Sequence, residues 1–288
     1  MDRYGRLSFV FAGILLLTAL VPAQTSATPP PPRPMTLGVI GASVSAGFGS
    51  GVRVADAMDA AIRKPHRLLD RSTVMFFVRY KKSTPKILAE FKKEDVDGIV
   101  ALDYLFWFAA GKKSYDERAR DVKSAVDQIL ALGKPVILGA VPPLRHVSPR
   151  ILSPDKVAPL EDVRRLNTLV AKLIANRKDV VLLPVDRWID ALEKKTPIPE
   201  LASVGAKAVA ASDIFQRDGL HLSRTGTAFA TLMVLRALTH DAGLLKENES
   251  LRTLEDMEHA MDSKGRRKRP APSKGPQPTN PNGEKKAG

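Results

Sequence analysis

The chain has 288 residues, of which 44% are hydrophobic, and it carries a formal net charge of +14 at pH 7. This size and composition allow one large hydrophobic core or two small ones. Because the chain contains no cysteine, disulfides and lipid attachment through an N-terminal cysteine are excluded, and an exported fold would depend on its core alone.

Residues 1–27 have the pattern of a secretory signal peptide. Two arginines precede the uncharged run Leu7–Pro22, and small residues offer cleavage sites after Ala23 or Ala27. The apolar run is short for a membrane span, which needs about 20 residues. We therefore expect a secreted protein, or one of the periplasm or cell envelope, with an uncleaved N-terminal anchor as the alternative.

A proline-rich spacer, residues 28–34, precedes the domain that we expect over residues 35–245. Five short apolar runs in this domain are rich in Val, Ile and Leu, as strands buried on both faces are. These runs are Leu37–Ile40, Val74–Val78, Gly98–Leu102, Pro135–Ala140 and Val180–Val185. Amphipathic helical patterns separate the runs, so the sequence predicts an α/β fold with a parallel sheet covered on both faces. Ligands of such sheets bind beyond the carboxyl ends of the strands.

The C-terminal part of the chain divides into two segments. Residues 246–263 predict a helical extension, and residues 264–288 form a polar tail, rich in Pro, Gly and Lys, that we expect to be disordered. Half of the net charge lies in this tail. Weak contact with an anionic surface or an acidic polymer is one interpretation of the tail, and a solvated end is the other. No aromatic residue lies among its charges, so no specific nucleic-acid partner is expected.

The loop after the first apolar run, "GASVSAGFGSG", is rich in glycine but matches neither phosphate-binding motif. A dinucleotide loop requires G-x-G-x-x-G, and Gly47 and Gly49 are followed by Val52 at the third position. A P-loop requires four residues between its glycines and a lysine after the second, whereas Gly41 and Gly47 enclose five and Phe48 follows. The remaining interpretations are an ordinary tight turn or a serine presented as a nucleophile.

A nucleophilic serine needs a base and a group that orients the base. Of the five histidines, His221 is the best candidate because Asp218 precedes it by three residues on a glycine-containing turn, in "FQRDGLHLSRTG". This spacing lets the carboxylate reach one imidazole nitrogen while the other faces outward. The turn follows the last strand and precedes the last helix, which predicts that it lies on the same rim as the glycine loop. A purely structural turn is the alternative for D-x-x-H alone.

Together the two ends of the domain resemble the SGNH (GDSL-type) hydrolase family. The segment "GASVSAGFG" is similar to the family's first block, G-D-S-[LIV]-[ST]-x-G, and "DGLHLSRTG" to its last, D-x-x-H-[LP]-[ST]-x-x-G. The resemblance covers about residues 36–242 and implies a three-layer αβα sandwich, flavodoxin-like, with ester hydrolysis by a serine nucleophile. It implies Ser43 as nucleophile and as backbone oxyanion donor, His221 as general base and Asp218 as its orienter. Ser45 matches a loop position that is not the nucleophile.

The chain departs from the family pattern at the groups that would complete an oxyanion hole. No glycine lies between Val52 and Asp97, and "ALDYLFWFAAG" after the third run has no asparagine. Asp103 is the polar residue near the expected place, and one missing oxyanion donor costs roughly 3–4 kcal/mol of barrier. If Asp103 lines the site, it is protonated, organises backbone donors, or leaves oxyanion chemistry impaired. Otherwise Asp103 caps a helix beside a packed aromatic cluster.

The sequence thus supports two functional hypotheses. The first is an exported serine esterase acting on an acyl or acetyl ester of a lipid or glycan; it needs no metal or cofactor, and no His/Cys/Asp cluster suggests one. The second is a catalytically impaired relative that binds a cell-envelope glycan or a partner protein. Geometry discriminates: an enzyme needs Ser43 Oγ within about 2.6–3.2 Å of His221 and N–H groups converging beside the serine.

Overall fold

A computed structural model describes residues 33–206 and 209–268. The predicted signal peptide, most of the spacer and nearly all of the basic tail therefore lie outside the described residues. Among the described residues, those from Pro34 onward belong to one compact unit.

Five parallel strands form a single sheet in the order β2-β1-β3-β4-β5. They are β1 (Met35–Val39), β2 (His66–Asp70), β3 (Gly98–Ala101), β4 (Val136–Gly139) and β5 (Val180–Leu183). This is the flavodoxin-like order, in which the direction of winding reverses between β1 and β3. The predicted α/β fold with a five-stranded parallel sheet is confirmed.

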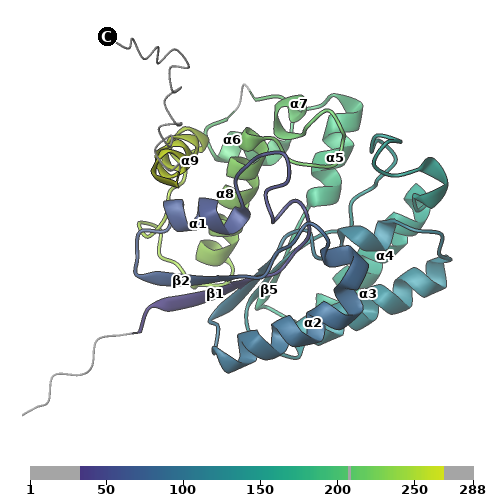
Figure 1. The fold of residues 1–288 in the computed structure, drawn as a ribbon, viewed down its shortest axis with the longest axis horizontal. Helices are drawn as coiled ribbons and strands as arrows, with labels where there is room; N and C mark the ends of the chain where they lie inside the picture. Colours follow the sequence, from purple (N-terminus) through teal and green to yellow (C-terminus); the bar gives the residue numbers. More distant parts are fainter. Residues whose placement is uncertain (1–32, 207–208, 269–288) are drawn as a thin grey trace, which may run out of the picture. The chain divides into compact units, whose positions relative to one another are not determined.

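Helices cover both faces of the sheet and give three layers (Figure 1). One face carries α2 (Phe76–Lys93), α3 (Tyr115–Leu130) and α4 (Leu160–Ile174), and the other carries α1 (Val54–Ala61) and α8 (Arg224–His240). Shorter helices lie in the connections: η1 (Phe106–Ala109), η2 (Pro154–Lys156), α5 (Val185–Lys194), α6 (Pro199–Ser203) and α7 (Ala211–Ile214). The strands β1, β3 and β4 are buried along their whole length, whereas the edge strands β2 and β5 are largely half-buried.

The prediction of a strand at Val74–Val78 is wrong. Residues 74 and 75 form a turn, and α2 begins at Phe76. The second strand is instead His66–Asp70, "HRLLD", which pairs with β1 at the edge of the sheet. An edge strand that is half-exposed needs no continuous apolar run, so its sequence gave no signal of the kind that marks the central strands.

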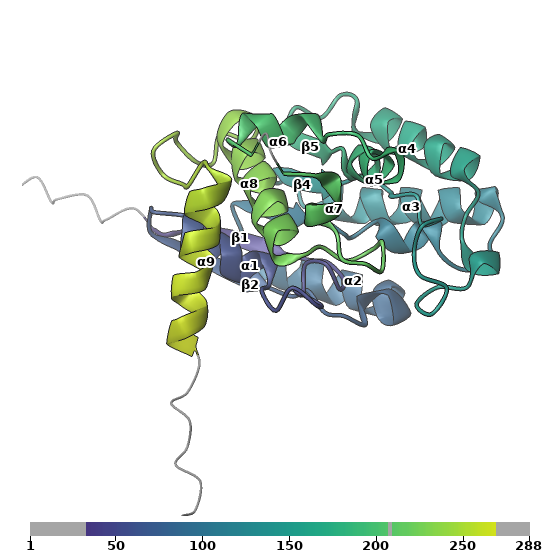
Figure 2. The same ribbon diagram turned by 90° about the horizontal axis from the view of Figure 1, so that it is seen from above.

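A last helix, α9 (Leu254–Lys268), packs against α1 and α8 (Figure 2). Its buried residues Leu254, Met257 and Met261 are spaced three and four apart, so they share one helix face. The helix continues past residue 263, where the sequence predicts its end. None of the helices in the described ranges is long and apolar enough to span a bilayer.

Candidate active site

Three segments that are distant in sequence meet at the carboxyl ends of β1 and β3. They are the loop 40–53 after β1, Asp103 just after β3, and the turn 215–223 that precedes α8. Gln216 ties the first and third segments together, because its Nε2 donates to the carbonyl oxygens of Phe48 at 3.1 Å and Leu222 at 2.7 Å. This place is the switch point at which ligands of doubly wound sheets bind.

Ser43, His221 and Asp218 are connected by hydrogen bonds. Ser43 Oγ lies 2.9 Å from His221 Nε2, and His221 Nδ1 lies 2.7 Å from Asp218 Oδ2. An ionised carboxylate only accepts hydrogen bonds, so Nδ1 donates to Asp218 and Nε2 accepts from the Ser43 hydroxyl. Ser43 and His221 are both buried, and the Phe48 ring packs over the imidazole at a centroid distance of 4.6 Å.

The turn holds Asp218 in a fixed orientation. Asp218 Oδ1 accepts the backbone N–H groups of Leu220 and His221, each at 2.9 Å. Gly219, with a φ of 70°, makes this turn possible; a Cβ there would also lie 2.5 Å from the carbonyl oxygen of His146. Burial acts to raise the pKa of Asp218, but the hydrogen bonds from His221 and Leu220 outweigh it and lower that pKa.

Asp103 binds the serine loop from inside the protein. Its Oδ1 accepts the backbone N–H of Ala42 at 2.9 Å and the Ser45 hydroxyl at 2.6 Å. Its Oδ2 accepts the backbone N–H groups of Val44 at 2.8 Å and Ser45 at 3.2 Å. Burial raises the pKa of Asp103, and these hydrogen bonds act in the opposite direction. Of the interpretations of Asp103 given above, the organisation of backbone groups matches this geometry; its side chain caps no helix, since η1 begins after Leu105.

Gly41 leaves the room that this carboxylate requires. A Cβ at Gly41 would lie 2.2 Å from Asp103 Oδ1 and 2.4 Å from Ser45 Oγ. Ser45 is fully buried, and its hydroxyl donates to Asp103 and does not contact His221. The two serines of the loop therefore have different surroundings, and Ser43 is the one that contacts the imidazole.

The backbone N–H of Ser43 lies between groups that are already bound. Its neighbours Ala42, Val44 and Ser45 all donate to Asp103, while the N–H of Ser43 donates to no described residue. This N–H is therefore available to an oxygen atom of a ligand. The buried indole N–H of Trp107, a residue that also lines the cavities beside Ser43, likewise has no acceptor among the described residues.

A pocket of about 560 Å³ opens beside Ser43 and His221. Its volume is in the range of pockets that enclose small-molecule ligands. Most of its lining is aromatic or aliphatic: Phe48, Val74, Met75, Phe77, Trp107, Phe108, Ile151, Leu152 and Leu220. The rings of Phe77 and Trp107 stack at 3.7 Å and join the start of α2 to η1. The few cationic groups in the lining are Lys113 and Lys156.

A buried arginine fixes one wall of this pocket. Arg118 is 2% exposed. Its Nη1 donates to the carbonyl oxygens of Phe108 at 2.7 Å and Ala110 at 2.9 Å, and its Nη2 donates to that of Gly111 at 2.5 Å. Burial lowers the pKa of Arg118. All three acceptors belong to pocket-lining residues, so this guanidinium holds the wall against the start of α3.

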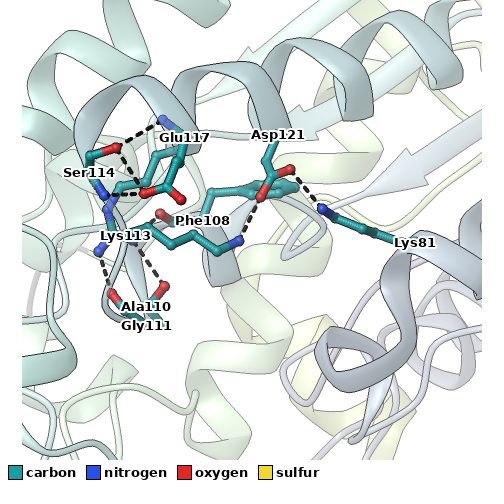
Figure 3. A network of polar contacts seen from close by, with 9 residues as sticks. Lys81, Phe108, Ala110, Gly111, Lys113, Ser114, Glu117 and Asp121 are labelled. Carbon is teal, nitrogen blue, oxygen red and sulfur yellow. Dashed lines mark hydrogen bonds and ion pairs between the residues drawn. The ribbon is translucent and has the colours of Figure 1, made fainter.

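An ion-pair network joins the same region to α2 (Figure 3). Asp121 of α3 pairs with Lys113 at 2.6 Å and with Lys81 of α2 at 3.2 Å. Neither Arg118 nor the pocket lining was predicted from the sequence. The one signal for Arg118 in the sequence is its position, because it lies four residues before Val122 and so places a charge on the apolar face of α3.

The other histidines lie outside the pocket lining. His66 contacts Asp59 and the Lys64 carbonyl, and His146 pairs with Glu193. Within the described residues, no group of three or more His, Cys, Asp or Glu side chains could hold a metal ion.

The fold and the site define an α/β protein with a Ser-His-Asp arrangement at the sheet's switch point. The chain is similar to solved structures of SGNH- and GDSL-type hydrolases. These include TesA (18% identity, 71% of this chain and 98% of that chain, TM-score 0.43). A GDSL-like lipase from Bacteroides thetaiotaomicron has 13% identity, covering 71% and 87%, with a TM-score of 0.44. An acetylxylan esterase from Geobacillus stearothermophilus has 14% identity, covering 70% and 93%, with a TM-score of 0.42.

No protein-family model and no curated protein sequence matches the chain. Identities this low carry no information about substrate, so the chemistry has to come from this chain's own residues.

Proposed function

We propose that this protein is a serine hydrolase that cleaves carboxylic esters through an acyl-enzyme. The observation that carries the proposal is the continuous chain of hydrogen bonds from Ser43 Oγ to His221 at 2.9 Å and from His221 to Asp218 at 2.7 Å. These distances lie in the range that proton transfer between a nucleophile and its base requires.

In the proposed reaction, Ser43 Oγ attacks the ester carbonyl while His221 Nε2 takes the hydroxyl proton. The resulting oxyanion is stabilised by the backbone N–H of Ser43, which has no partner among the described residues. Collapse of this intermediate breaks the bond to the alcohol, which leaves with the proton from His221. Water then attacks the acyl-enzyme with His221 as base, releasing the acid and restoring Ser43. Asp218 keeps the imidazole in the required tautomer throughout.

The pocket favours an ester with an apolar acyl group. Its lining is largely aromatic and aliphatic, which binds a hydrocarbon chain but offers few hydrogen bonds to a sugar. Between the two substrate types that the sequence left open, an acyl ester of lipid type therefore fits this site better than an acetylated glycan. Export of the enzyme, which rests on the N-terminal sequence, is part of the same proposal.

One observation favours the second candidate, a binding protein with impaired catalysis. The position expected to supply an oxyanion donor carries Asp103, whose oxygens accept four hydrogen bonds and donate none as a carboxylate. With fewer donors at the oxyanion, the same pocket would bind an apolar ligand and turn over slowly.

A fluorophosphonate probe tests the nucleophile. Purified protein is expected to be labelled, and Ser43→Ala should abolish the labelling because the probe reacts only with an activated serine. Ser50→Ala is the matched control, since Ser50 lies in the same loop and, among the described residues, its hydroxyl bonds only to Val52. The parent and Ser50→Ala should hydrolyse p-nitrophenyl hexanoate faster than the acetate, and Ser43→Ala should hydrolyse neither ester. Labelling that survives Ser43→Ala refutes the assignment, and labelling without turnover favours the binding protein.

A further inference from the structure

The large apolar side chains that are exposed gather at the mouth of the pocket. Among the described residues they are Phe48 (48% exposed), Val74 (38%), Met75 (56%), Val78 (57%) and Ile151 (44%). All of them except Val78 line the pocket, and Val78 follows Met75 by three residues at the start of α2. We call this set the apolar rim.

The apolar rim is built from three separate parts of the chain. The serine loop supplies Phe48, and the segment between β4 and η2 supplies Ile151. The turn leading into α2, with the first turn of that helix, supplies Val74, Met75 and Val78. A single exposed apolar residue is ordinary, but a contiguous group around a pocket marks a surface that binds an apolar partner. We therefore expect these exposed apolar side chains to be buried against such a partner.

Cations accompany the apolar rim. Arg79 and Lys82 follow Met75 and Val78 by four residues, so each lies one turn further along the same side of α2. Arg150 precedes Ile151. These three side chains are exposed, and no described carboxylate forms an ion pair with any of them.

No residue of the pocket lining carries a carboxylate, and two carboxylates that adjoin lining residues are already paired with cations. Asp121 pairs with Lys81 and Lys113, and Asp155 pairs with Lys112. The unpaired charge beside the apolar rim is therefore positive.

We infer that the apolar rim docks onto an anionic lipid surface. Proteins that bind such surfaces insert apolar side chains at the boundary between headgroups and acyl chains. Their Arg and Lys side chains lie about one helical turn away, at the level of the anionic headgroups. A protein partner could also bury the apolar side chains. The unpaired positive charge of Arg79, Lys82 and Arg150, however, favours a partner whose surface is uniformly negative. Docking this way would open the pocket directly toward the acyl chains, so an ester could reach Ser43 without crossing water.

Cosedimentation with vesicles tests this inference without hydrolysis. The protein carries Ser43→Ala throughout, and the vesicles contain dioleoylphosphatidylcholine alone or mixed equally with dioleoylphosphatidylglycerol. The parent should bind the mixed vesicles more tightly than the neutral ones. Adding Met75→Asp and Val78→Asp should weaken that binding about tenfold or more, because apolar side chains no longer enter the lipid. Arg79→Gln and Lys82→Gln should each weaken it about fivefold, on the mixed vesicles only.

The matched control is Thr168→Asp with Ala171→Asp. It makes the same charge change with the same spacing on α4, at exposed residues that do not line the pocket, so it should bind like the parent. Equal binding of the rim variant and the control to mixed vesicles overturns the inference and assigns binding to another cationic part of the chain. Absence of binding by the parent also overturns it and favours a protein partner for the rim. Neither result touches the proposed esterase, which the fluorophosphonate probe tests separately.

Discussion

Asp103 sets the conformation of the loop that carries Ser43. Its two oxygens accept three backbone N–H groups and one hydroxyl of the loop, and among residues 42–45 only the N–H of Ser43 remains without an acceptor in the described part of the chain. The family's first block has an aspartate beside the serine, where this chain has Ala42. A carboxylate from the end of β3 thus organises the loop from within, which makes Asp103 a positioning residue in the proposed reaction.

Asp103→Asn tests this role at the scale of one atom. The amide NH₂ would face N–H groups of the loop instead of accepting from them, and the loop would shift. We expect kcat on p-nitrophenyl butyrate to fall about a hundredfold, because a displacement of about 1 Å at the nucleophile has that effect. KM should change little, since Asp103 does not contribute to the large pocket.

The control for this change is Ser45→Ala, which removes one donor and leaves Asp103 its three backbone partners. Its loss of kcat should be much smaller. Both variants need a native circular dichroism spectrum for the comparison. A variant Asp103→Asn that folds and reacts with the fluorophosphonate at the parent rate contradicts the positioning role.

At the scale of elements, Arg118 connects α3 to the wall of the pocket. Its guanidinium donates hydrogen bonds to the carbonyl oxygens of Phe108, Ala110 and Gly111. The chain leaves η1 at these residues, which therefore form no regular hydrogen-bond ladder. Burying a charge here is stabilising only because these acceptors surround it. The wall therefore depends on one side chain from a neighbouring helix.

Arg118→Met should loosen this wall and destabilise the protein. The free energy of unfolding is expected to fall by about 3 kcal/mol, because carbonyl groups that lose a buried donor cost about 1–3 kcal/mol each. KM for p-nitrophenyl hexanoate should rise while kcat for the acetate changes less, since the long chain uses the pocket wall. The control is Arg165→Met, at an exposed arginine whose guanidinium carbon lies 3.5 Å from the centroid of the Tyr115 ring. Equal urea midpoints for the two variants contradict the role of Arg118.

The element that the sequence misassigned belongs to the same pocket. The central strands β1, β3 and β4 were predictable because strands buried on both faces are continuously apolar. The run Val74–Val78 is likewise continuously apolar, but its exposed side chains form part of the apolar rim and do not pack in the sheet. Sequence patterns report burial, and they mislead where apolar residues are exposed for binding.

At the scale of the whole molecule, the strand order determines which distant residues meet. The sequence predicted that Ser43 and the Asp218–His221 turn lie on one rim, since both follow strands of a parallel sheet. The structure brings them within hydrogen-bond distance. The sequence left several roles open for Asp103, and it could not choose among them, because the choice depends on the pairing of β1 with β3 and on the exact approach of two loops. Spacing along a sequence carries no such information.

The turn that carries Asp218 also links the site to the stability of the whole chain. Because the pKa of Asp218 is below its ordinary value of 3.8 in the folded protein, its ionised form stabilises the fold. This contribution is fully present above the ordinary value and is lost as the pH falls through the lower, folded-state pKa. We therefore expect Asp218→Asn to reduce the free energy of unfolding at neutral pH, and the gap to the parent to shrink on acidification.

Urea unfolding of both proteins at neutral pH and at about pH 3 measures this gap. Asp116→Asn, at an exposed carboxylate in the first turn of α3, controls for the loss of one negative charge. The same Asp218→Asn protein should also lose roughly 10⁴-fold in kcat at neutral pH, because the imidazole no longer has a carboxylate to fix its tautomer. A stability gap that is constant or grows toward low pH would show that the hydrogen bonds to Asp218 do not favour its ionised form. The activity loss would then have to come from geometry alone.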